Sequence, residues 1–211
     1  MKKNKYLNFV YSFLVILILV SVFSLFVVNI IILNLEIGTV WDLIRSTLMS
    51  SEEFTPQDFS HQTGEIINDS SYGGEVVKAS PSSFKDNGEN YVNLGPGILL
   101  FPGKYRLIYD VKVSEIGSDQ DFAVIDIFEL NRGAEAEKTL NSSKYQNASF
   151  KKESLEFETD GGRKFEFRVY YLGQGELEVG KVKIEALEKN YGMALKKSVK
   201  ILTKIKQVLQ K

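Results

Sequence analysis

The residues of this chain that could carry chemistry are mainly carboxylates and tyrosines, because the usual nucleophiles and metal ligands are scarce. The 211-residue sequence contains no cysteine and a single histidine, His61. Disulfides, thiol nucleophiles, cysteine-ligated metals and multi-histidine metal sites are therefore excluded. A serine–histidine–aspartate arrangement would have to use His61. That residue lies in a polar stretch, and we interpret it as a solvated linker residue.

Acidic side chains are numerous, but none of them lies in a recognisable catalytic motif. A glycosidase needs two carboxylates at a set separation, which sequence spacing alone does not give. Asp126 is the most unusual acid, since it interrupts an apolar stretch from Val124 to Phe128. A buried charge needs a partner, so the sequence predicts a hydrogen-bonded structural aspartate here. We therefore expect a protein that is not an enzyme, and a hydrolase is the least favoured hypothesis.

Tyrosines beside polar side chains could instead bind a sugar. An aromatic ring offers an apolar surface to the C–H face of a sugar, while carboxylate, amide or guanidinium groups hydrogen-bond to its hydroxyls. Arg168 and Tyr170 alternate with Phe167 and Val169, so they share one face of a predicted strand. The alternative is that the tyrosines fill a core and the arginine pairs with an acid. The candidate ligand-binding residues are Tyr72, Glu75, Tyr91, Arg168 and Tyr170.

A period of two in the apolar residues between positions 65 and 188 predicts the strands that would position these side chains. Turn signals such as Gly95-Pro96-Gly97 and Gly161-Gly162 separate the strands. The predicted strands are Glu75–Ala79, Tyr91–Leu94, Lys104–Ser114, Phe122–Leu130, Ser154–Thr159, Lys164–Leu172 and Glu176–Leu187.

Several strands at this spacing, with no helical pattern between them, predict a mainly β fold, namely an antiparallel β-sandwich. We favour a jelly roll over an immunoglobulin-like sandwich, because the cysteines of the immunoglobulin signature are missing.

The amino-terminal part of the chain predicts a membrane anchor. Residues 7–35 contain no charged side chain, and ~20 apolar residues are enough to span a bilayer. Lys2, Lys3 and Lys5 precede this run, which favours a cytoplasmic amino terminus and an extracytoplasmic domain in a single-pass protein of the cell membrane. We favour an uncleaved signal anchor over a cleaved signal peptide, whose apolar region is much shorter.

The remaining segments follow from changes in residue pattern. Trp41 suits the membrane interface. The tail is a predicted basic amphipathic helix, which could lie on the outer leaflet, pack on a partner helix or pack on its own domain. The predicted order is a cytoplasmic tail (1–6), a transmembrane helix (7–35), a juxtamembrane helix and linker (36–64), the sandwich (65–188) and the basic helix (190–211).

Three segments resemble galactose-binding-like jelly rolls, the fold shared by many carbohydrate-binding modules. Gly74–Ala79 is similar to their opening strand, and Gly95–Leu107 resembles their segment G-x-x-x-L-x-P-G-x-Y. Phe167–Val179 is similar to their closing hairpin, so the resemblance covers about residues 65–188. It implies sugar binding, and it leaves a structural calcium open. The stretch that would ligate calcium reads Val179-Gly180-Lys181-Val182 here, without an aspartate. No other cofactor is expected.

Two functional hypotheses come from these patterns. The first is a membrane-anchored extracytoplasmic module that binds carbohydrate or a cell-envelope glycan. The second is a non-catalytic structural or assembly subunit of a cell-envelope membrane complex, whose helices associate with a membrane-protein partner or with another copy. The net charge of −1 implies no nucleic-acid partner, whereas the lipid bilayer is an expected partner of both.

Overall fold

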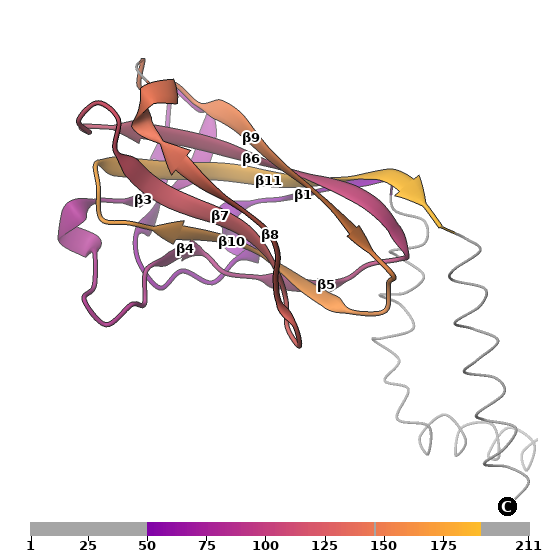
Figure 1. Cartoon of the computed structure of the whole chain (residues 1–211). Helices are drawn as coiled ribbons and strands as arrows, with labels where there is room; N and C mark the ends of the chain where they lie inside the picture. Colours follow the sequence, from indigo (N-terminus) through magenta and orange to yellow (C-terminus); the bar gives the residue numbers. More distant parts are fainter. Residues whose placement is uncertain (1–49, 146, 191–211) are drawn as a thin grey trace, which may run out of the picture. The chain divides into compact units, whose positions relative to one another are not determined.

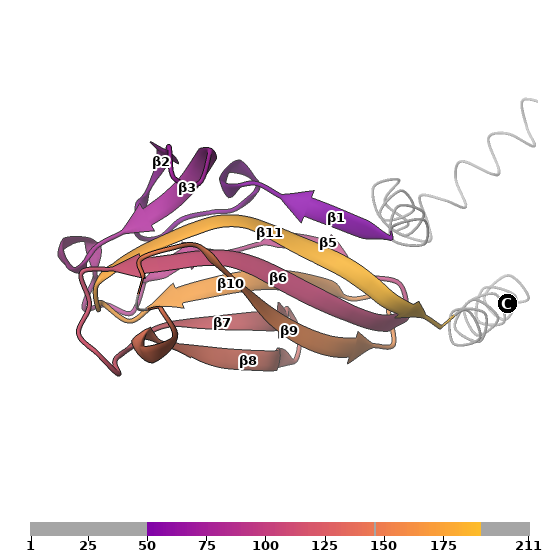
Figure 2. The same cartoon turned by 90° about the horizontal axis from the view of Figure 1, so that it is seen from above.

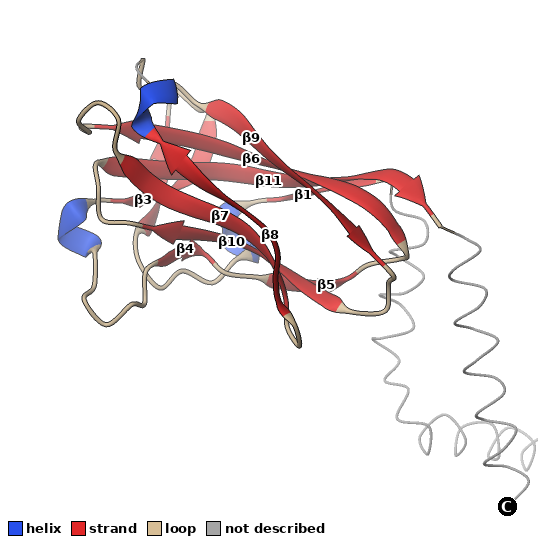
Figure 3. Ribbon diagram, viewed as in Figure 1, coloured by secondary structure: helices blue, strands red, loops and turns tan. Residues whose placement is uncertain are grey.

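Alternation along the long strands places one row of side chains in a core and the other row outside it. In β6 (Gly103–Ser114) and β10 (Lys164–Tyr171), every second residue is buried. The computed structural model describes residues 50–145 and 147–190, which form two antiparallel sheets packed face to face (Figures 1 and 2). Strands dominate the described residues, as Figure 3 shows, so the predicted mainly β antiparallel fold is confirmed.

The first sheet has the strand order β2-β3-β11-β6-β9, and β1 pairs with β11 beside β3. Its long central pair, β6 and β11, runs antiparallel over most of its length. Its strands are β1 (Ser51–Phe54), β2 (Glu65–Asp69), β3 (Gly74–Ala79), β6, β9 (Lys151–Thr159) and β11 (Glu176–Lys189).

The second sheet has the strand order β4-β10-β7-β8. β4 pairs with the carboxyl-terminal half of β10, and β5 pairs with its amino-terminal half. Its strands are β4 (Tyr91–Asn93), β5 (Pro96–Leu99), β7 (Asp121–Glu129), β8 (Gly133–Asn141) and β10. Three short 3₁₀ turns lie in the connections: η1 (Pro56–Asp58), η2 (Pro81–Ser83) and η3 (Ser142–Lys144).

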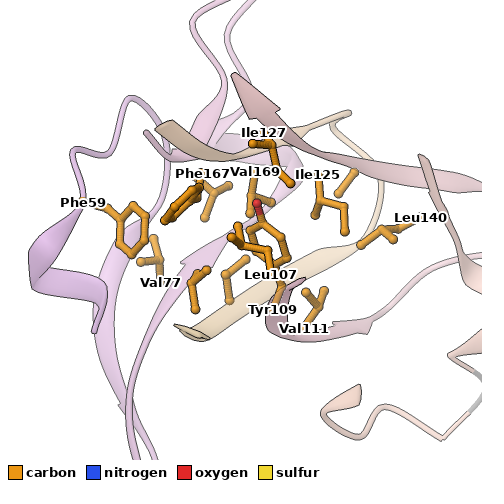
Figure 4. Close-up of a cluster of buried hydrophobic side chains, with 14 of the residues drawn as sticks. Phe59, Val77, Leu107, Tyr109, Val111, Ile125, Ile127, Leu140, Phe167 and Val169 are labelled. Carbon is orange, nitrogen blue, oxygen red and sulfur yellow. The ribbon is translucent and has the colours of Figure 1, made fainter. Parts of the chain in front are cut away.

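The core between the sheets is built from aliphatic and aromatic side chains of both inner faces (Figure 4). Buried tyrosines need a partner for their hydroxyl groups. The Tyr105 hydroxyl donates to the carbonyl oxygen of Phe101 over 2.7 Å, and the Tyr109 hydroxyl donates to that of Asp126 over 2.9 Å. The second bond runs from the first sheet to the second, so it fixes β6 against β7 through the middle of the core.

The residues just before the predicted sandwich also belong to it. The sequence predicts a linker up to residue 64, but β1 pairs with β11 from Ser51↔Glu185 to Phe54↔Val182. His61, interpreted as a solvated linker residue, is in fact partly buried, and its Nε2 lies 2.9 Å from the carbonyl oxygen of Pro56. Its Nδ1 contacts the carbonyl oxygen of Val92 in β4. His61 therefore links η1 to β4.

Both ends of the described region lie at one end of the sandwich (Figure 2). The backbone N–H of Ala186 in β11 donates to the carbonyl oxygen of Ser50, and that of Asn190 donates to Pro102, over 2.9 and 2.7 Å. Within residues 50–145 and 147–190, no helix is long and apolar enough to cross a membrane. The predicted transmembrane helix (7–35), Trp41 and residues 191–211 of the predicted basic helix lie outside the described residues.

The position of Phe54 provides a test of β1 as part of the core. Phe54 is 5% exposed and lies against the rings of Phe59 and Phe167 at 6.1 and 5.8 Å. Replacing it by alanine should lower the free energy of unfolding by about 3–5 kcal/mol, because a large core side chain is lost. Denaturant unfolding of the full chain measures this change. Ser51→Ala, at an exposed position of the same strand, should alter the free energy of unfolding by at most about 0.5 kcal/mol. If Phe54→Ala changed the free energy of unfolding as little as Ser51→Ala does, residues 51–54 would be a linker and not part of the core.

Candidate functional site

The outer face of the second sheet carries most of the predicted site residues. In β10, the side chains of Arg168 and Tyr170 point away from the core, since Phe167, Val169 and Tyr171 between and beside them are buried. Tyr170 pairs with Tyr91 of β4 in the sheet register, so the two tyrosines lie side by side. Three of the five candidates are thus brought together by strand pairing alone.

The rings on this face contact one another and the guanidinium of Arg168. The ring centroids of Tyr91 and Tyr170 are 5.1 Å apart, with the rings at 75°. The Arg168 guanidinium carbon lies 5.0 Å from the Tyr91 ring centroid and 3.7 Å from that of Phe128. A cation over a ring face is attracted by its π electrons, so the arginine holds these rings in one cluster.

Asp126 anchors this cluster. Its two carboxylate oxygens accept hydrogen bonds from Nε and Nη2 of Arg168 over 2.8 and 2.6 Å, a bidentate pair. The two residues lie directly opposite each other in the β7–β10 register, and each side chain is 12% exposed. Burial alone would lower the pKa of Arg168, but the hydrogen bonds to Asp126 and the charge interactions with Asp126, Tyr91 and Glu166 together outweigh it, and the pKa lies above its usual value. The buried aspartate that the sequence predicted has its partner in Arg168.

We call this surface the aromatic face and define it by Tyr91, Phe128, Tyr170, Arg168 and Asp126. All three rings are half-buried, so each keeps part of its surface open to solvent. Burial raises the pKa of the Tyr91 hydroxyl, which remains a hydrogen-bond donor at neutral pH. The face therefore offers apolar ring surface next to fixed hydrogen-bonding groups, the combination expected for contact with a sugar.

Tyr72 and Glu75 lie on a different surface, against the outer side of the first sheet. The Tyr72 hydroxyl donates to Asp110 Oδ2 over 3.0 Å and accepts from the backbone N–H of Lys181 over 2.8 Å. Burial raises its pKa to about 12. Glu75 accepts a hydrogen bond from the Gln57 side chain. Tyr72 therefore holds the β2–β3 connection against the sheet.

A hollow of about 480 Å³ lies beside these two residues, but its charged groups are paired within the protein. Lys181 Nζ lies 2.6 Å from Glu53, and Lys152 Nζ lies 2.7 Å from Asp110. The stretch 179–182, compared above with a calcium-ligating segment, thus places a lysine next to an acid. Within residues 50–145 and 147–190, no three carboxylate or imidazole groups converge as metal ligands.

The outer face of the first sheet carries a network of ion pairs beside a smaller aromatic contact. There the ring centroids of Tyr72 and Phe150 are 4.5 Å apart, and Lys112 Nζ lies 5.2 Å from the Phe150 centroid. Lys112 lies within 3.1 Å of both Asp69 and Glu178, and Arg106 Nη2 is 2.6 Å from Glu156. Arg106 and Glu156 are 40% and 58% exposed, whereas Lys112, Asp69 and Glu178 are about as buried as the Arg168–Asp126 pair. The two outer faces therefore differ in the balance of ion pairs and aromatic rings.

Sequence reasoning missed Phe128 as a site residue. The stretch Phe122–Leu130 is nearly all apolar, which predicted a strand buried on both faces. In the structure, Phe128 and Val124 of β7 are half-buried and face outward with Asp126. The signal that could have found them is the position of Asp126 two residues before Phe128, since alternate residues share a strand face.

Comparison with solved structures finds carbohydrate-binding modules among the neighbours of this chain. The family 6 module of a laminarinase from Zobellia galactanivorans has 18% identity and a TM-score of 0.43, over 64% of this chain and 98% of its own. A family 35 module from Clostridium thermocellum has 17% identity and a TM-score of 0.44, over 64% and 98%.

A module from Cellvibrio mixtus lichenase 5A, in complex with cellotriose, has 12% identity and a TM-score of 0.43, over 65% and 98%. At such low identities and TM-scores, these likenesses assign neither a family nor a ligand to this chain. No family model and no curated protein matches the sequence.

The energy of the Arg168–Asp126 pair can be compared with that of the exposed pair Arg106–Glu156. In a double-mutant cycle with Arg168→Met and Asp126→Asn, the coupling free energy should be about 2 kcal/mol or more, because removing one partner leaves a nearly buried charge. The cycle with Arg106→Met and Glu156→Gln should give at most about 1 kcal/mol, since those side chains are 40% and 58% exposed. Unfolding of the full chain measures both. Equal couplings would contradict an anchoring role for Asp126.

Proposed function

We propose that this chain is a membrane-anchored extracytoplasmic module that binds carbohydrate on its aromatic face. The observation that carries the proposal is the cluster of Tyr91, Tyr170 and Phe128 around the Arg168–Asp126 pair. Its rings are held by strand pairing and by the guanidinium, so little side-chain freedom is lost when a ligand binds. Preorganised rings of this kind favour contact with the flat C–H face of a pyranose.

The polar groups of the cluster would orient the sugar. The Tyr91 and Tyr170 hydroxyls can donate and accept hydrogen bonds. The remaining lone pairs of the Asp126 carboxylate can accept from sugar hydroxyls without breaking its bonds to Arg168. Tyr72 and Glu75, which the sequence grouped with these residues, lie at the first sheet, so the proposed site does not include them.

The positions of the two ends of the described region support attachment of the module on one side. Ser50 and Asn190 lie at the same end of the sandwich, so the segments before and after it leave from neighbouring positions. We propose that residues 7–35 form the single transmembrane anchor, with the amino terminus in the cytoplasm. In this proposal the sandwich is of the jelly-roll type, and the basic helix (190–211) contacts the outer leaflet or a partner helix.

Truncation of the rings tests the binding site. Tyr91→Ala and Tyr170→Ala should each weaken glycan binding about tenfold or more, because a ring that contacts the sugar is lost. Tyr170→Phe, which keeps the ring, should retain most of the affinity. Binding is measured on the full chain in a detergent without a sugar headgroup, against a panel of envelope and plant polysaccharides.

The matched control is Tyr72→Ala, which removes a tyrosine from the other sheet and should leave glycan binding unchanged. Equal losses for Tyr72 and Tyr170, with folding intact, would place binding elsewhere. If no polysaccharide binds at all, while Leu202→Ser and Ile205→Ser abolish oligomers in detergent, the chain is instead a structural or assembly subunit.

The absence of cysteine gives a clean test of membrane orientation. In intact cells, a membrane-impermeant maleimide should label Asn87→Cys, at an exposed position of the sandwich, but should not label Lys3→Cys. Permeabilisation should make Lys3→Cys reactive as well. Labelling of Lys3→Cys alone in intact cells would invert the proposed orientation, and recovery of the chain from the soluble fraction would contradict the anchor.

A further inference from the structure

The charges of the aromatic face restrict the class of glycan that it can bind. Outward-facing residues of β7, β8 and β10 bring three acidic and two basic side chains to this surface, according to the burial alternation and the strand register. The excess is therefore negative. These residues are Asp126, Glu137 and Glu166, with Lys164 and Arg168.

The cation at the centre of this face is already neutralised. Nε and Nη2 of Arg168 both donate to Asp126, and each side chain of the pair is only 12% exposed. Glu166 lies two residues away on the same strand face, and its negative charge further raises the pKa of Arg168. A second carboxylate therefore lies on the same strand face as the guanidinium. The positive charge of Arg168 is already paired with a carboxylate of the protein, whereas an arginine without an acidic partner could bind an anionic ligand.

An anionic sugar could bind this surface in two arrangements, and both are unfavourable. A ligand carboxylate that took the guanidinium from Asp126 would leave that carboxylate nearly buried and unpaired, which is costly. A ligand carboxylate that left the pair intact would lie near Asp126, Glu137 and Glu166, with repulsion as the result. The hydroxyls of an uncharged sugar meet neither difficulty, because they can donate to carboxylates and accept from N–H or O–H groups.

We propose that the ligand of the aromatic face is an uncharged glycan, and that the Arg168–Asp126 pair excludes uronic-acid and phosphate-bearing polymers. This inference rests on the proposed function and names the ligand class of the same site. Asp126 sets the specificity by occupying Arg168. The rings supply the affinity, whereas the acidic groups decide which charge state of the sugar is accepted.

The experiment compares matched oligosaccharides that differ in charge alone. The panel pairs neutral oligomers of several linkages with the same oligomers oxidised at C6 to the carboxylate. The full chain, in a detergent without a sugar headgroup, should bind the neutral member of a pair at least about tenfold more tightly. Binding of the neutral member should change little between low and high salt, because no ligand charge is involved.

Two variants identify the residue responsible. Asp126→Asn should narrow or reverse the preference, since it frees the guanidinium and removes one negative charge. Glu156→Gln, which changes an acid paired with Arg106 on the other outer face, should leave the preference unchanged. If unfolding measurements show that Asp126→Asn does not fold, Glu166→Gln takes its place and should raise the affinity for the oxidised member.

The outcomes separate this inference from the proposed function. Tighter binding of the oxidised members would overturn the inference and leave carbohydrate binding in place. An unchanged preference in both folded Asp126→Asn and Glu166→Gln would also overturn it. Binding of neither member of any pair would overturn the proposed function together with the inference.

Discussion

The pairing of β7 with β10 is the constraint on which the rest of the candidate site depends. This register sets Arg168 directly opposite Asp126, and the two form a bidentate ion pair with side chains that are 12% exposed. Separating such a nearly buried pair is costly, because each charge would be left without its partner. The guanidinium is consequently held between Tyr91 and Phe128, and the rings that would contact a ligand are ordered by an interaction inside the sheet. β7 is also held from the core side, because the Tyr109 hydroxyl of β6 donates a hydrogen bond to the carbonyl oxygen of Asp126.

The two outer faces of the sandwich show how one fold can carry two chemistries. On the first sheet, long charged side chains such as Lys152 and Arg106 pair with acids on neighbouring strands and remain exposed to solvent. On the second sheet, the Arg168 guanidinium lies over the Phe128 and Tyr91 rings, so charge and ring surface are combined in one cluster. Tyr72 illustrates the difference, since its hydroxyl forms hydrogen bonds with Asp110 and with the backbone N–H of Lys181. These bonds hold the β2–β3 hairpin against the sheet.

Much of the fold could be predicted from the sequence because β6 and β10 alternate between buried, mostly apolar residues and outward, mostly polar ones. β8 was missed because Leu140 is the only large apolar residue in Gly133–Asn141, so the strand has no apolar face that the sequence would reveal. β1 was missed because a four-residue strand in a polar stretch is defined by its pairing with β11 and by Phe54 alone. The candidate residues divided in a similar way. Arg168 and Tyr170 share a strand, which spacing reveals, whereas the neighbourhood of Tyr91 and the separation of Tyr72 depend on strand order and register, which spacing does not encode.

The most direct measurement for this account is an NMR titration of the full chain in detergent with a glycan that it binds, followed through backbone amides and the Arg168 side-chain Nε–H. We expect chemical-shift changes concentrated on β4, β7 and β10, with the Nε–H of Arg168 still hydrogen-bonded to Asp126 in the complex. Changes concentrated around Tyr72, Asp110 and Lys181, with the aromatic face unaffected, would contradict it.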